Sequence, residues 1–93
     1  MFIGVCTMEM HIPDSGSLKG KRHSLRSLKD RIRNSFNVSV AEVEHNDLWQ
    51  KAALAVAAVS NDKAHLNRTL DHVLNMVRAV RDIDLLDYHI EIF

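Results

Sequence analysis

Positive charge is concentrated in one short segment of the chain, and clustered cations are the groups with which proteins bind phosphate. Residues 18–33 hold seven of the twelve lysines and arginines and a single acid, Asp30, although the chain has no net charge. Five basic and eleven acidic residues are left for the rest of the chain. Because electrostatic steering depends on the local field, overall neutrality does not argue against an anionic partner.

The spacing of these cations predicts a basic stripe along a helix. Four of them recur at i, i+4, i+7 and i+11: Arg22, Arg26, Lys29 and Arg33. A separate apolar stripe of Leu25, Leu28 and Ile32 predicts the face that packs on the core. Solvated helix faces usually mix charges, so the near absence of acids is unusual; a polyanion contact and an ordinary solvated face are both open interpretations. We predict that RNA contacts this helix and the loop before it through Lys19, Lys21, Arg22, Arg26, Lys29 and Arg33.

Other residue types that do chemistry lack the spacing it requires. The loop from Gly16 to Gly20 is one residue too short for a phosphate-binding P-loop, and Arg22 stands where that motif has a serine or threonine. His65 and His72 share a helix face but lie two turns apart, too far to bind one metal ion together. The sequence therefore predicts no metal site, no cofactor and no catalytic residue.

The acids and the remaining reactive side chains fit structural roles. Glu42 and Glu44 alternate onto one face of an expected edge strand, where charge prevents unwanted pairing. Cys6 lies in an apolar strand and is expected in the core rather than as a nucleophile. Trp49 is able to stack a base, but a role in closing a hairpin against the sheet is the preferred interpretation.

Hydrophobic periodicity predicts the elements that hold these residues. Alternation indicates strands, and apolar stripes at helical spacing indicate helices. The run 51–60 is rich in alanine and suits a helix as well, but its short length and flanking turn residues favour a buried strand. The expected elements are a strand over 1–12, a helix to about residue 34, strands over 36–44 and 51–60, a helix over 63–81 and a strand over 84–92.

This order predicts an α+β fold, a single ferredoxin-like βαββαβ domain over residues 1–93. Two right-handed crossovers place both helices on one face of a four-stranded antiparallel sheet. The first and third strands are the most apolar and should be central. Their second apolar face would be uncovered in a monomer, so we expect a homodimer or higher homo-oligomer through the open sheet face. The alternative is that long flanking side chains cover it.

Composition places the chain among ordinary soluble proteins. The apolar fraction is 46% and the charged fraction 26%, which argues against disorder. One cysteine excludes an internal disulfide. We expect a cytoplasmic protein with no membrane contact, because the longest apolar run is too short to span a bilayer and no secretion signal precedes the first strand.

The segments "SLKGKR", "FNVSVAEV" and "DLWQKAAL" resemble the YlxP-like family of small bacterial proteins of unknown function. The resemblance extends over nearly the whole chain. It implies a ferredoxin-like fold and, from the genes that accompany the family, a role near translation or ribosome maturation. It implies no catalytic residues. The matched signature consists of Ser17, Leu18, Lys19, Lys21, Arg22, Asn37, Ser39, Glu42, Asp47, Trp49 and Gln50.

The sequence thus predicts a non-enzymatic cytoplasmic module that binds RNA or a ribosomal particle through the basic helix and its preceding loop. The alternative is a homo-oligomeric protein-interaction module that uses the open sheet face and contacts no nucleic acid. A small-molecule enzyme is the least favoured class. Acylphosphatases share the expected fold, but the loop "PDSGSLKGKR" differs from their phosphate-binding loop.

Overall fold

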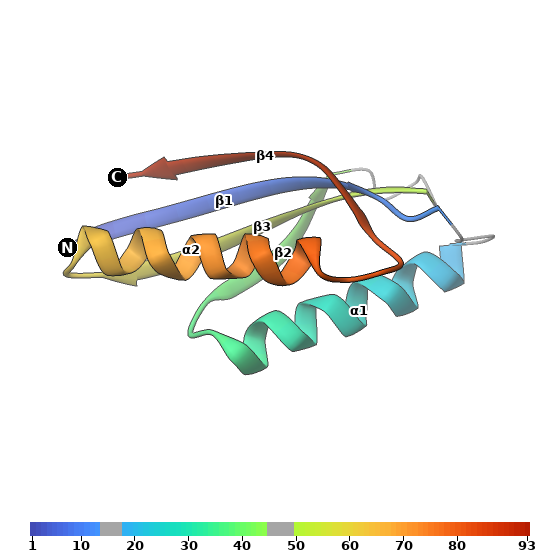
Figure 1. Cartoon of the computed structure of the whole chain (residues 1–93), viewed down its shortest axis with the longest axis horizontal. Coiled ribbons are helices and arrows are strands. Elements are labelled where there is room, and N and C mark those ends of the chain that lie inside the picture. The colour runs from blue at the N-terminus through green and yellow to red at the C-terminus, as the bar shows by residue number, and fades with distance from the viewer. Residues whose placement is uncertain (14–17, 45–49) are drawn as a thin grey trace.

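The computed structural model describes residues 1–13, 18–44 and 50–93. Its elements are β1 (Phe2–His11), α1 (Leu18–Ser35), β2 (Ser39–Glu44), β3 (Lys51–Ser60), α2 (Lys63–Arg78) and β4 (Asp84–Ile92). The strands form one antiparallel sheet in the order β2-β3-β1-β4, and both helices lie on the same side of it (Figure 1). The predicted ferredoxin-like α+β fold is confirmed, with β1 and β3 in the centre.

The two central strands pair over their whole length, from Phe2 opposite Ser60 to His11 opposite Lys51. The alanine-rich run is therefore the predicted strand rather than a helix. β2 begins three residues later than predicted, and α2 ends three residues earlier, at Arg78. At the start of α2 the carboxylate of Asp62 accepts hydrogen bonds from two backbone N–H groups of the first turn, as expected of an N-cap.

The core lies between the sheet and the helices. Alternate residues of β1, including Cys6, Met8 and Met10, are fully buried on the helix side. Leu25, Leu28 and Ile32 of α1 are buried as their spacing predicts, and α2 contributes a second buried stripe: Leu66, Leu70, Val73, Leu74 and Val77. Both helices are thus fixed to the sheet along one side, and α1 presents its other side to solvent.

Gly4 of β1 lies directly against two leucines of α2. A Cβ atom at this position would lie 2.9 Å from a methyl carbon of Leu70 and 3.0 Å from two side-chain carbons of Leu66. Real Cβ atoms almost never make contacts this short. The missing side chain of Gly4 therefore lets two leucines of α2 rest directly on β1.

A bulge changes the face assignment at the start of β4. The pairing of β1 with β4 shifts register between Glu9 and Met10, so that Leu85 lies opposite Met10. Leu85 packs against the core, whereas Leu86 is 55% exposed. The alternation along 84–92 predicts that Leu86 shares one face with Tyr88, Ile90 and Ile92. Leu86 is the residue that the bulge inserts between the pairs Glu9–Asp87 and Met10–Leu85, so the alternation is interrupted there.

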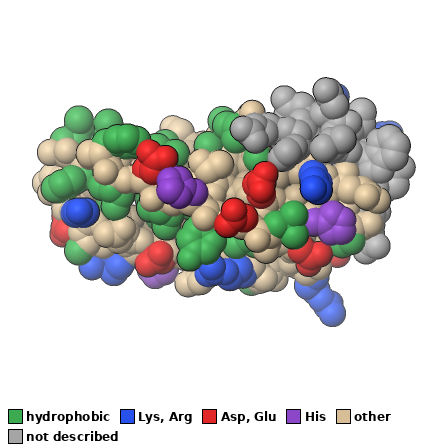
Figure 2. All heavy atoms as spheres, turned by 90° about the horizontal axis from the view of Figure 1, so that it is seen from above, with side chains coloured by type: hydrophobic (Ala, Val, Ile, Leu, Met, Phe, Trp, Pro, Cys, Tyr) green, Lys and Arg blue, Asp and Glu red, His purple; other side chains and the backbone are tan. Residues whose placement is uncertain are grey.

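The outer face of the sheet carries no helix (Figure 1). Figure 2 views this face and shows hydrophobic side chains gathered toward one end, with acids and histidines beyond them. Ile3 and Val59 face each other across β1 and β3 and are 38% and 63% exposed. Backbone hydrogen bonds in both directions join Ile3 to Phe93, which is 68% exposed. We call Ile3, Val59 and Phe93 the apolar row.

The acids of the outer face lie along β1 and β4. Glu9 is opposite Asp87, and Glu91 is opposite Val5 in the same register. Two histidines accompany them: His11 lies 3.6 Å from Asp84, and His89 lies 3.1 Å from Glu91. The acids make the outer face of this half of the sheet unfavourable for phosphate.

Candidate nucleic-acid interface

A groove of about 460 Å³ runs along the N-terminal half of α1. The described side chains that line it are three permanent cations and a histidine: Lys19, Arg22, His23 and Arg26. Their i, i+3, i+4 and i+7 spacing puts all four on one face of the helix. That face points away from the buried stripe, so folding leaves these side chains exposed to solvent. We call these four residues the α1 groove.

The cations of the α1 groove have no acidic partner in the described part of the chain. Within residues 1–13, 18–44 and 50–93, no acidic side chain forms an ion pair with Lys19, Arg22 or Arg26. The first turn of α1 contains no acid either. Three positive charges within two helical turns repel one another, and a bound anion relieves this repulsion. The α1 groove is therefore suited to phosphate.

Lys21 lies outside this groove, on the buried side of α1. It is only 1% exposed, and its Nζ atom is 4.0 Å from a carboxylate oxygen of Glu42 on β2. The prediction that Lys21 contacts RNA from the helix surface does not fit this position. Lys21 precedes Leu25 by one turn and continues the stripe through Leu28, so its long aliphatic stem packs on the core while its ammonium group reaches β2.

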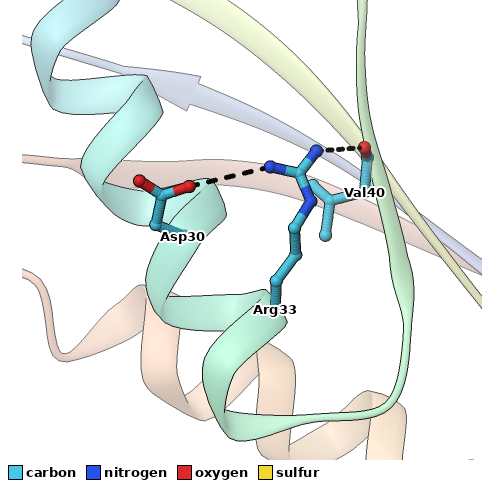
Figure 3. A network of polar contacts seen from close by, with 3 residues as sticks. All are labelled: Asp30, Arg33 and Val40. Carbon is cyan, nitrogen blue, oxygen red and sulfur yellow. Dashed lines mark hydrogen bonds and ion pairs between the residues drawn. The ribbon is translucent and has the colours of Figure 1, made fainter.

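The side chain of Arg33 connects α1 to β2 (Figure 3). Its guanidinium donates a hydrogen bond of 3.0 Å to the backbone carbonyl of Val40 and lies 3.8 Å from the carboxylate of Asp30. Val40 belongs to an edge strand, whose outward carbonyls need partners. Arg33 therefore caps the sheet edge, and its charge is shared with Asp30.

Lys29 and the signature residues are spread over several places. Lys29 is partly buried and does not line the α1 groove. Asn37, Ser39 and Gln50 are exposed, and Glu42 is half-buried beside Lys21. Three more of the predicted signature residues lie outside the described ranges: Ser17, Asp47 and Trp49. The described residues thus gather only Lys19, Arg22 and Arg26 of the six predicted cations into one site.

His23 is the member of the α1 groove that sequence reasoning missed. It also borders a second groove of about 210 Å³ on the other flank of α1. Arg31 of α1 and Asp82, which follows α2, are among the residues that line this second groove. The signal was present, because His23 follows Lys19 by four residues and precedes Arg26 by three. It was overlooked because the six histidines were considered as metal ligands rather than as neighbours of the cations.

Cys6 and the histidines offer no alternative chemistry in the described part of the chain. Burial is the main cause that raises the pKa of the Cys6 thiol from 9.0 to about 11; Asp71 raises it further, and Arg78 opposes the shift. A thiol with so high a pKa is a poor nucleophile at neutral pH. Within the described residues, no three histidine, cysteine or carboxylate side chains are placed to hold a metal ion.

Neither helix in the described part of the chain has the length and apolar character needed to cross a bilayer.

Comparison with known sequences gives a family. Residues 3–90 match the family described as "Protein of unknown function (DUF503)". The chain is 37% identical over 82 residues to "Uncharacterized protein YlxP" of Bacillus subtilis, an alignment that covers 88% of this chain and 89% of that protein. The resemblance noted from the sequence motifs is confirmed.

Comparison with solved structures supports the fold alone. The de novo designed protein Foldit4 superposes with a TM-score of 0.58 at 9% identity, covering 100% of this chain and 97% of that one. SnoaB, a cofactor-independent oxygenase from Streptomyces nogalater, superposes with a TM-score of 0.55 at 11% identity, covering 98% and 90%. At such identities the shared architecture carries no information about activity.

Proposed function

The chain belongs to the family described as "Protein of unknown function (DUF503)", and from this premise we propose that it is a non-enzymatic, cytoplasmic RNA-binding module. The observation that carries the proposal is the α1 groove, in which three cations without an acidic partner among the described residues line one surface. The acids on the outer face of the sheet supply the contrast, because they direct a polyanion toward the helices. A role in translation or ribosome maturation fits such a module.

Charge reversal in the α1 groove tests this proposal. The triple variant Lys19→Glu/Arg22→Glu/Arg26→Glu should weaken binding to a fluorescein-labelled RNA more than about tenfold, because phosphate contacts dominate RNA affinity. Fluorescence anisotropy measures the affinity. The matched control Lys63→Glu/Arg68→Glu/Arg81→Glu changes the net charge equally at three exposed positions elsewhere and should bind nearly as the wild type does.

Two results would contradict RNA binding by the α1 groove. Equal weakening in both triple variants would mean that net charge alone governs the interaction. Equal affinity of the wild-type protein for RNA and for a polyglutamate of the same charge would mean that the site does not distinguish nucleic acid from acidic protein.

We propose a second, independent function for the outer face of the sheet, which is to bind a second copy of the chain. The specific observation is the apolar row, whose three side chains are exposed next to one another. A two-fold axis parallel to the strands would place Ile3 of one copy against Val59 of the other and leave the acids of β4 at the rim. Such an isologous contact would bury the hydrophobic end, with Glu91 of β4 at its border and Asp84 and Asp87 at the far end of the strand.

A further inference from the structure

The α1 groove is short. Lys19 and Arg26 are seven residues apart, which is about 10 Å along a helix axis at 1.5 Å per residue. Beyond Arg26 the predicted stripe offers no further cation of this kind, because Lys29 is partly buried and Arg33, although exposed, already binds Val40 and Asp30. Lys21 is on the opposite side. The site therefore offers three permanent cations, which is enough for about three phosphates.

The α1 groove is also concave. Its volume of about 460 Å³ is in the range of pockets that enclose small ligands, roughly 300–1,000 Å³. A double helix approaches a protein as a broad convex surface, and the narrow major groove of A-form RNA keeps side chains from its bases. A single strand can instead turn individual nucleotides into a hollow of this size. The shape selects a flexible strand.

His23 supplies a surface on which a base can stack. It lies one turn after Lys19 and one turn before Arg26, on the flank of the α1 groove that borders the second groove. Proteins that bind single-stranded RNA stack unpaired bases on aromatic rings, histidine included, and on arginine planes. Phosphates on the cations and a base on His23 would together engage all four of the described side chains that line the groove.

We infer that the α1 groove binds a short stretch of single-stranded RNA, with about three phosphates on Lys19, Arg22 and Arg26 and one base stacked on His23. This inference rests on the proposed RNA-binding function and specifies its ligand. Readout of sequence is weak in such a site, because contacts to phosphate carry no sequence information and stacking accepts every base.

Salt dependence tests the number of phosphates. The wild-type protein is titrated with an eight-nucleotide oligouridylate over a series of salt concentrations, and the logarithm of the affinity is plotted against that of salt. Three phosphate contacts to a single strand predict a slope of about −2, whereas contacts from all six predicted cations would give about −4. A slope near −4 overturns the inference while leaving RNA binding intact.

Strand preference is tested with a duplex RNA that carries the same number of phosphates. We expect the duplex to bind at least about tenfold more weakly than the oligouridylate, because it cannot enter the α1 groove. Equal or tighter duplex binding overturns the inference. If neither RNA binds, the proposed function itself fails, so the two failures are distinguishable.

Stacking is tested with a matched pair of variants at one exposed position. His23→Ala removes the ring and should weaken oligouridylate binding about fivefold or more, whereas His23→Phe keeps a stacking surface and should retain most of the affinity. Thermal unfolding of both variants controls for folding. If His23→Phe binds as weakly as His23→Ala, or if neither differs from the wild type, no base stacks on His23.

Discussion

At the scale of single residues, two lysines of α1 that are two positions apart have opposite surroundings. Lys19 is exposed in the α1 groove, whereas Lys21 is buried against the core beside Glu42. Two positions along a helix correspond to a rotation of more than half a turn, so the same residue type meets solvent in one case and the sheet in the other. Binding and stability can therefore be separated by changing one lysine at a time.

Replacing each lysine by methionine should show this separation. Lys21→Met keeps the aliphatic stem but removes the charge that faces Glu42, and we expect it to lower the free energy of unfolding by about 1–3 kcal/mol. Lys19→Met should leave stability almost unchanged and weaken RNA binding. Urea denaturation and anisotropy measure the two effects. Weaker RNA binding by folded Lys21→Met protein would contradict the assignment of Lys21 to the core.

The buried thiol of Cys6 predicts a loss of stability in alkali. Its pKa is raised from 9.0 to about 11, mainly by burial. Below pH 9 the thiol is protonated in both the folded and the unfolded state, and its contribution to the free energy of unfolding is fully present. As the pH rises toward 11, only the unfolded chain releases the proton, and this contribution is lost. Between pH 8 and pH 10, the free energy of unfolding of the wild type should fall by about 1 kcal/mol more than that of Cys6→Ala.

Urea denaturation of the two proteins at a series of pH values measures this difference. The comparison with Cys6→Ala cancels the tyrosine and lysine groups that titrate in the same range. A difference that stays constant with pH would mean that the thiol of Cys6 ionises as readily in the folded protein as in the unfolded chain.

At the scale of elements, the contact of α2 with β1 depends on the absence of a side chain at Gly4. The two leucines that pack there come from successive turns of α2 and would be displaced by even one carbon atom. Interiors are packed too densely to absorb such a change without cost. The position of α2 is therefore set by Gly4 as much as by the apolar stripe of the helix.

Substitution of Gly4 should destabilise the fold in proportion to the atoms added. We expect Gly4→Ala to cost about 1 kcal/mol and Gly4→Val about 2–3 kcal/mol, as is typical of overpacked cores. In a Leu70→Val background, which removes the methyl carbon 2.9 Å away, Gly4→Ala should cost less. Urea denaturation of the double-mutant cycle measures the coupling. Additive effects would show that Leu70 does not limit the space.

At the scale of the whole molecule, the α1 groove and the acids of β1 and β4 lie on different sides. The helix side carries the α1 groove, and the outer face of the sheet carries the acids of β1 and β4 together with the apolar row. The two proposed interactions use different sides, so RNA and a second copy of the chain would not compete. Changes to the sheet face should leave RNA affinity per chain unaltered.

The variant Val59→Asp tests the sheet face at this scale. Sedimentation equilibrium should show a concentration-dependent homodimer for the wild type and a monomer for Val59→Asp, because a carboxylate in the apolar row would be buried without a partner. Arg68→Asp, an exposed position on α2, is the matched control and should still dimerise. A wild-type protein that stays monomeric at high concentration would contradict dimerisation through this face.

The fold was predictable because periodicity alone orders the elements, and the central strands are the ones that are apolar on both faces.

The candidate site was only partly predictable. The sequence shows a stripe of four cations on α1. The helical spacing alone does not reveal that the side chain of Arg33 donates a hydrogen bond to the backbone carbonyl of Val40. The burial of Lys21 was readable from its spacing to Leu25 and Leu28, and was missed because lysines are expected in solvent. The bulge that exposes Leu86 depends on pairing between strands distant in sequence, which local alternation does not encode.

The separation of charge has a kinetic consequence. A chain with zero formal charge feels no net attraction to a polyanion from afar, but its unequal sides give it an electric dipole moment. If the α1 groove binds RNA as proposed, the field of the strand should exert a torque on this dipole that turns the groove toward the phosphates before contact is made. Encounters should therefore be productive more often than random orientation allows. The association rate constant should fall as added salt shortens the Debye length, even though the protein is neutral.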